Sequence, residues 1–136
     1  MEKNLDCVEH YPDPNPEWLL EDIAKSLGLS SENIVIGNGS TELIYLFCEI
    51  FLDNQTEAII PVPFFSEYKA AIKRYNSKMM FLQCTPEQGF HPDLEELEKL
   101  ITKETRVIFL CNPNSPTGVL YKKEDLLKIV NFAAER

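Results

Sequence analysis

Apolar residues along this chain occur in short continuous runs and in longer stretches with helical spacing. The short runs predict buried strands at residues 33–36, 58–60, 79–82 and 106–110. The longer stretches predict helices at residues 16–27, 40–52, 66–75, 93–101 and 123–135. Because strands and helices alternate, the pattern predicts βαβ units, a mostly parallel sheet and an α/β fold.

Polar and turn-forming residues mark the ends of several predicted helices. Asn15 is a good N-cap for the first helix, and Gly28 ends it. Ser66 is expected to cap the third helix, and Asp93 with Glu96 makes a capping-box-like start for the fourth.

Two predicted helices have more apolar surface than a single neighbouring element could cover. The helix at 40–52 is apolar on nearly every side and is expected to be deeply buried. The last helix has an apolar face that needs a sheet, formed by Leu126, Leu127, Val130, Phe132 and Ala133. We therefore expect residues 15–136 to form an incomplete domain, truncated at its C-terminus. Residues 1–14 are polar and punctuated by prolines, and we expect them to form an extended arm.

Composition and charge narrow the classes of partner. The chain has 136 residues, of which 44% are hydrophobic, which fits one globular domain or part of one. Its net charge of −9 argues against a nucleic-acid backbone or an anionic membrane surface as partner. Four dispersed cysteines without a Cys-x-x-Cys pair, and only two histidines, argue against a metal site. No signal peptide or membrane-spanning run is found, so we expect a cytoplasmic location.

Three segments place polar or aromatic residues directly after predicted strands, where open α/β sheets bind ligands. The stretch Cys111–Gly118, Cys-Asn-Pro-Asn-Ser-Pro-Thr-Gly, is either such a site or an ordinary strand-to-helix loop. Gly39, Ser40 and Thr41 open a helix, where free N–H groups and hydroxyls favour an anion such as phosphate; the alternative is a plain N-cap. A dinucleotide loop fits worse, because Glu42 stands where a third glycine would be needed.

The stretch Asn112–Gly118 resembles the Asn-Pro-x-Asn-Pro-Thr-Gly loop of fold-type I class I/II aminotransferases, which depend on pyridoxal 5′-phosphate (PLP). Residues 37–44, Gly-Asn-Gly-Ser-Thr-Glu-Leu-Ile, and residues 63–68, Pro-Phe-Phe-Ser-Glu-Tyr, also resemble segments of this family and occur in the expected order. The resemblance covers essentially all of the chain but only the first part of such an enzyme. It implies a partial three-layer α/β/α large domain, in which strands 58–60, 79–82 and 106–110 form a three-stranded remnant with 58–60 central.

The resemblance also implies cofactor contacts. It assigns the PLP phosphate to Gly39, Ser40 and Thr41, and it assigns stacking on the pyridine ring to Phe65, although Phe65 is equally well interpreted as a core residue. Ser115 stands where the family usually has asparagine, which contacts the phenolic oxygen of PLP, and serine still offers a donor. Tyr11 resembles a tyrosine that reaches the PLP phosphate of a neighbouring subunit, which implies a homodimer; the alternative is an exposed arm residue.

The catalytic groups of the family lie outside the matching segments. The lysine that forms a Schiff base with PLP and the aspartate that pairs with the pyridinium nitrogen fall beyond this chain, so residues 1–136 alone are expected to be inactive. The resemblance implies a small, phosphorylated amino-acid substrate, with either threonine-phosphate decarboxylase of cobalamin synthesis, slightly favoured, or histidinol-phosphate aminotransferase as subfamily. The hypothesis from another class is a non-catalytic α/β anion-binding module.

Overall fold

The computed structural model describes residue 11 and residues 13–134, and the chain divides into two compact units, Met1–Gly37 and Asn38–Arg136. The first unit contains the helix α1 (Glu17–Leu27), which ends as predicted at Gly28 with a φ of +67°. The predicted N-cap is wrong by one residue, because Pro16 takes that position. Pro16 has a ψ of 68°, which is not helical, so the helix begins only at Glu17.

The strand predicted at residues 33–36 is not formed. Asn33 ends a 3₁₀ turn, η2 (Ser31–Asn33), and Ile34 is extended, with φ −124° and ψ 132°. Residues 34–36 make no β-ladder with any described residue. An extended backbone becomes a strand only when a neighbouring strand forms hydrogen bonds with it. The apolar run at residues 33–36 therefore predicts the extended conformation but not the pairing.

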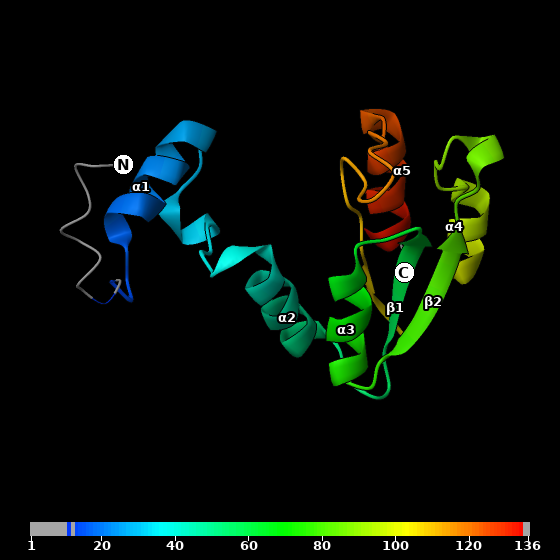
Figure 1. Ribbon diagram of the computed structural model, residues 1–136, viewed down its shortest axis with the longest axis horizontal. Helices are drawn as coiled ribbons and strands as arrows, with labels where there is room; N and C mark the ends of the chain where they lie inside the picture. The colour runs from blue at the N-terminus through cyan, green and yellow to red at the C-terminus, as the bar shows by residue number, and fades with distance from the viewer. Residues whose placement is uncertain (1–10, 12, 135–136) are drawn as a thin grey trace. The chain divides into compact units, whose positions relative to one another are not determined.

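The second unit holds a parallel sheet with helices between its strands (Figure 1). Its elements are α2 (Gly39–Phe51), β1 (Glu57–Val62), α3 (Ser66–Arg74), β2 (Lys78–Gln83), η3 (Pro86–Gln88), α4 (Leu94–Leu100), β3 (Thr105–Ile108) and α5 (Lys123–Ala134). The strand order is β2-β1-β3, and both pairings are parallel. The predicted central position of strand 58–60 is therefore confirmed.

Alternate residues of β1 point into two separate cores. Ala58 and Ile60 pack with α2 and α3, while Ile59 packs with α4 and α5 on the other face. All three side chains are completely buried. A central parallel strand is covered on both faces, so the sheet lies between two helical layers, and the predicted partial α/β/α architecture is confirmed.

The expected burial of two helices is only partly found. In α2 only Cys48 is buried, and in α5 only Ile129. The apolar side chains of α2 that stay 43–73% exposed are Leu46, Phe47, Ile50 and Phe51. In α5 three members of the predicted face, Leu127, Val130 and Ala133, are exposed. Each helix packs on the sheet with one side, and no described element covers the other side.

Two further helix starts show one correct and one wrong cap. Asp93 caps α4 as predicted, accepting hydrogen bonds from the N–H groups of Glu95 (2.9 Å) and Glu96 (3.2 Å), but the Glu96 side chain does not complete the predicted capping box. Ser66 is instead the first residue of α3, and Phe65 occupies the N-cap position without a side-chain hydrogen bond. In residue 11 and residues 13–134, no helix has the length and apolar composition needed to span a membrane.

Candidate functional site

The start of α2 places Gly39, Ser40 and Thr41 at an exposed helix terminus. Gly39 has a φ of +81°, a conformation that favours glycine. The first N–H groups of a helix have no partner within the helix. Among the described residues, no side chain accepts a hydrogen bond from the N–H groups of Gly39, Ser40 or Thr41. The Glu42 carboxylate instead accepts hydrogen bonds from the backbone N–H of Asn38 (2.5 Å) and from Asn38 Nδ2 (3.1 Å). The terminus therefore keeps donors for an anion.

A cavity of about 400 Å³ opens beside this terminus. Its walls come from α2, from Tyr68 of α3 and from the end of β3 with the residues that follow it. The lining residues are Ser40, Leu43, Ile44, Phe47, Tyr68, Val107, Ile108, Phe109 and Leu110. A cavity of this volume, with apolar walls and the polar side chain of Ser40 at one corner, falls within the range of small-molecule sites.

Three aromatic rings connect the cavity to the turn after β1. The Tyr68 ring stacks on Phe109, with centroids 4.5 Å apart, and meets Phe65 edge-on at 5.8 Å. Burial and, after it, the neighbouring Cys111 thiol raise the pKa of Tyr68 to about 12. Its phenol is therefore neutral and able to donate a hydrogen bond at physiological pH. Phe65 does not itself line the cavity.

The loop Cys111–Gly118 is closed by hydrogen bonds from its own asparagines. Asn114 is 5% exposed, and its Nδ2 donates to Thr117 Oγ1 (2.9 Å) and to the carbonyl oxygen of Pro63 (3.1 Å). Asn112 Oδ1 accepts from the backbone N–H of Tyr121 (2.8 Å). Sequence reasoning missed Asn114 because its partner Pro63 lies 51 residues away. The only available signal was its presence in the motif.

The predicted site residues are only partly brought together. Ser40 lines the cavity with Tyr68, and Phe65 contacts Tyr68. Ser115 is exposed and makes no hydrogen bond to a described residue, but it directly follows Asn114, which is tied to the turn before Phe65. Tyr11 belongs to the first unit, where it is 99% exposed.

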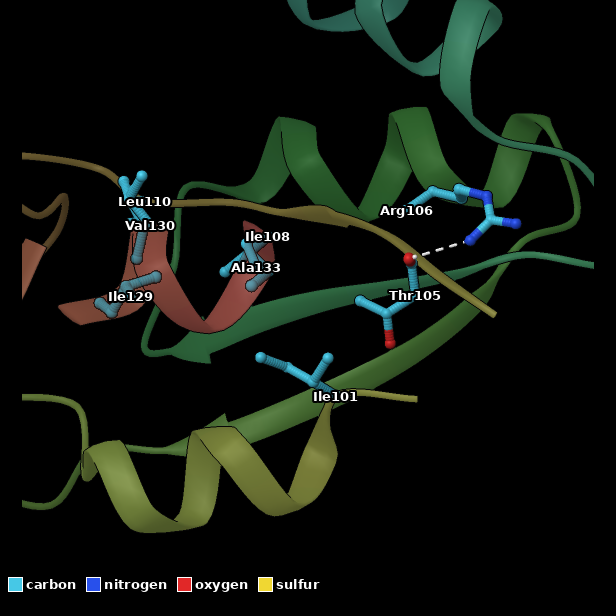
Figure 2. A pocket seen from close by; sticks show the side chains of 8 residues that line it. All are labelled: Ile101, Thr105, Arg106, Ile108, Leu110, Ile129, Val130 and Ala133. Atoms are coloured by element: carbon cyan, nitrogen blue, oxygen red, sulfur yellow. Dashed lines mark hydrogen bonds between the residues drawn. The ribbon is translucent and has the colours of Figure 1, made fainter. Parts of the chain in front are cut away.

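A second groove lies at the free edge of β3 and has no predicted site residue in it. It measures about 260 Å³ and is mostly apolar, lined by Ile101, Thr105, Arg106, Ile108, Leu110, Ile129, Val130 and Ala133 (Figure 2). Arg106 Nη1 donates hydrogen bonds to the backbone carbonyls of Lys103 (2.8 Å) and Thr105 (3.3 Å). Its donor is therefore used within the chain. We interpret this groove as packing space beside the free edge of β3, which pairs with β1 on its other edge.

The fold and the first cavity define an α/β protein with a cavity beside the carboxyl end of a parallel strand, the edge at which open α/β sheets bind ligands. The sequence matches the family model for aminotransferase class I and II over residues 6–136. The chain therefore belongs to the class I and II aminotransferase family.

Known relatives and structures agree with this family. The chain is 36% identical over 130 residues to histidinol-phosphate aminotransferase of Methanococcus aeolicus, covering 95% of this chain and 35% of that protein. It is 40% identical over 134 residues to the Methanococcus maripaludis enzyme of the same name, with coverages of 95% and 36%. Aspartate aminotransferase from Thermotoga maritima superposes with a TM-score of 0.87 at 30% identity, covering 93% of this chain and 36% of that one. The chain spans about a third of the length of these relatives.

Proposed function

We propose that this chain is the N-terminal part of a PLP-dependent aminotransferase and supplies part of the cofactor site. The observation that carries the proposal is the cavity that Ser40, at the N-terminus of α2, lines together with Tyr68 and the end of β3. In a member of this family, such a cavity offers hydrogen-bond donors for a phosphate at one corner and an apolar, aromatic wall beside them.

The residues present fit the cofactor. Gly39, Ser40 and Thr41 would hold the phosphate through backbone N–H groups and hydroxyls. Phe65 and Ser115 do not line the cavity itself, but Phe65 contacts Tyr68 of its wall. By family resemblance, Phe65 would stack on the ring and Ser115 would donate to its phenolic oxygen. When bound, PLP supplies an electron sink for chemistry at the amino-bearing carbon of a substrate. No lysine lines the cavity among the described residues, so we propose that residues 1–136 alone are inactive.

The reaction that we propose is amino-group transfer. The curated relatives compared above carry the name histidinol-phosphate aminotransferase. They favour transamination of a small phosphorylated amine over decarboxylation of threonine phosphate, and a role in histidine rather than cobalamin synthesis. Family membership also favours an enzyme over a non-catalytic anion-binding module.

The remaining features of the whole protein are proposed with it. Residues 1–14 would form an arm and residues 15–136 an incomplete PLP-binding domain. The complete protein would be a homodimer in which Tyr11 reaches the partner's cofactor phosphate. The thiols of Cys48, Cys84 and Cys111 are free, which suits a reducing cytoplasm.

The phosphate subsite can be tested by comparing two ligands. In the full-length protein, PLP should bind more tightly than pyridoxal, which lacks the phosphate, and Ser40→Ala should narrow that difference. Fluorescence titration measures both affinities, and exposed Ser30 on the other unit offers Ser30→Ala as the matched control. Equal affinity for PLP and pyridoxal would remove the assignment of Gly39, Ser40 and Thr41.

The reaction is tested separately. Histidinol phosphate and threonine phosphate are each supplied to the full-length enzyme, with a panel of 2-oxo acids as amino acceptors. Transfer of the amino group from histidinol phosphate supports the proposal. Release of carbon dioxide from threonine phosphate without amino transfer would show that the decarboxylase hypothesis is the correct one.

A further inference from the structure

Asn114 is the best-connected residue of the loop Cys111–Gly118. Its backbone N–H donates to Val119 O (2.7 Å) and its carbonyl accepts from the N–H of Gly118 (2.6 Å). Its Nδ2 donates to Thr117 Oγ1 (2.9 Å) and to Pro63 O (3.1 Å). Three of these bonds close the loop on itself. The fourth ties the loop to the turn after β1.

The chemistry of the partners fixes the orientation of two amides. A carbonyl oxygen such as that of Pro63 only accepts hydrogen bonds, so Asn114 must present its NH₂ group to it. The backbone N–H of Tyr121 only donates, so Asn112 must present its oxygen (2.8 Å). Two asparagines of one loop, two positions apart, therefore have opposite hydrogen-bonding roles.

The bond to Pro63 joins the two segments that carry proposed ring contacts. Pro63 stands two residues before Phe65, and Asn114 stands directly before Ser115. We infer that Asn114 is a positioning residue that sets the spacing between Phe65 and Ser115 through its bond to the Pro63 carbonyl. The inference rests on the proposed function, because the spacing matters only if both residues contact the same PLP molecule.

Aspartate substitution separates the two roles with matched changes in size and charge. Asn114→Asp places a carboxylate oxygen against the Pro63 carbonyl, where a donor is needed, and leaves a buried charge unsatisfied. Asn112→Asp keeps an acceptor for the Tyr121 N–H. In the full-length protein, we expect Asn114→Asp to weaken PLP affinity by about tenfold or more. We expect Asn112→Asp to stay within about twofold of the native protein.

The pH dependence gives a readout that is specific to the carboxyl introduced at position 114. Burial beside acceptor oxygens raises the pKa of the carboxyl introduced by Asn114→Asp. Below that raised pKa the carboxyl is neutral and carries an O–H donor in place of the amide. The ratio of variant to native dissociation constants should therefore return toward one as pH falls through that pKa. The ratio for Asn112→Asp should show no such recovery.

A third variant separates the tie to Pro63 from the folding of the loop. Thr117→Val removes the hydroxyl that Asn114 Nδ2 and the Val119 N–H both reach, but it leaves the Pro63 bond in place. We expect a smaller loss of PLP affinity than for Asn114→Asp. If Asn114→Asp does not fold, Asn114→Ala is measured in its place, and it should lose affinity without recovery at low pH.

Titrations with PLP, together with thermal melts without cofactor, test this inference. Lower PLP affinity of the Asn114 variant, measured at a temperature at which the melts show every variant to be folded, supports it. Native-like affinity of the Asn114 variant, or an equal loss in Thr117→Val, overturns it, while a preference of the native protein for PLP over pyridoxal keeps the proposed function intact. Failure of the native protein to bind PLP overturns both.

Discussion

Ser115 shows how one side chain changes the expected cofactor contact. It is exposed, and it follows a buried asparagine that is fixed by four hydrogen bonds. The loop therefore presents the residue at this position outward whatever its type. A serine there has a shorter reach than the asparagine usual in the family, but it keeps a hydroxyl donor.

Substitution of Ser115 in the full-length protein should reveal this contact. Ser115→Ala removes the donor and should weaken PLP binding by about 0.5–1.5 kcal/mol, the net contribution of one hydrogen bond. Ser115→Asn should keep or tighten binding, since it restores the usual donor. Dissociation constants from fluorescence titration measure both effects. If Ser115→Ala holds PLP as well as the native protein, Ser115 is a turn residue only.

Among the elements, the amino ends of the strands are joined by a polar cluster around Glu57. Glu57 is buried at the start of β1, and its Oε1 lies 2.5 Å from Lys78 Nζ of β2. Its Oε2 accepts from Thr102 Oγ1 (2.8 Å), just before β3. These hydrogen bonds, that of Lys78 first and that of Thr102 second, hold the pKa of Glu57 below its ordinary value of 4.5.

The lowered pKa predicts a loss of stability in acid. A carboxyl whose pKa is depressed in the folded state contributes stability above its unfolded pKa, and that contribution is lost as pH falls through the folded pKa. Glu57→Gln should therefore lower the free energy of unfolding at neutral pH and flatten its dependence on pH below about 4.5. Denaturant melts across this range measure both effects, with exposed Glu98→Gln in α4 as the control. If the free energy of unfolding of Glu57→Gln falls in acid as steeply as that of the native protein, other carboxyls cause the loss of stability.

The sheet was predictable because its signal is local in the sequence. The runs at 58–60 and 79–82 are continuous and apolar, and the run at 106–110 is apolar after Arg106, as expected for strands covered on both faces. They match β1, β2 and β3 to within two residues at each end. The central place of β1 followed from family resemblance rather than from the pattern itself.

Burial and long-range polar contacts were not predictable from the same signals. The apolar surface of α2 indicates what the helix can bury, but only a neighbouring element decides which side is covered, and Ile50 stays 73% exposed. Serine is a common N-cap residue, yet Ser66 is the first residue of α3 rather than its N-cap. The role of Asn114 depends on a carbonyl 51 residues away, and no local spacing encodes that contact.

At the scale of the whole molecule, many large apolar side chains are exposed. Exposed apolar side chains on α2 and α5 stand beside a β3 edge that no described strand occupies. An unpaired edge with apolar surroundings favours association with other chains. Burying one such leucine or phenylalanine contributes roughly 1.5–3 kcal/mol, while a whole domain is stable by only about 5–15 kcal/mol.

We therefore expect residues 1–136, produced alone, to be marginally folded or to self-associate, and the full-length protein to be a dimer. Ile50→Glu in α2 and Val130→Lys in α5 place charges on side chains that are 73% and 60% exposed. They should reduce association of residues 1–136 without loss of helix content, because neither side chain packs in the described cores. In the full-length protein the same Ile50→Glu should lower the melting temperature, since a covered face would then hold an unpaired carboxylate. Sedimentation and denaturant melts of both lengths measure these effects. A soluble, monomeric 1–136 with a steep cooperative melt would show that these residues form a complete domain and that the exposed faces need no cover.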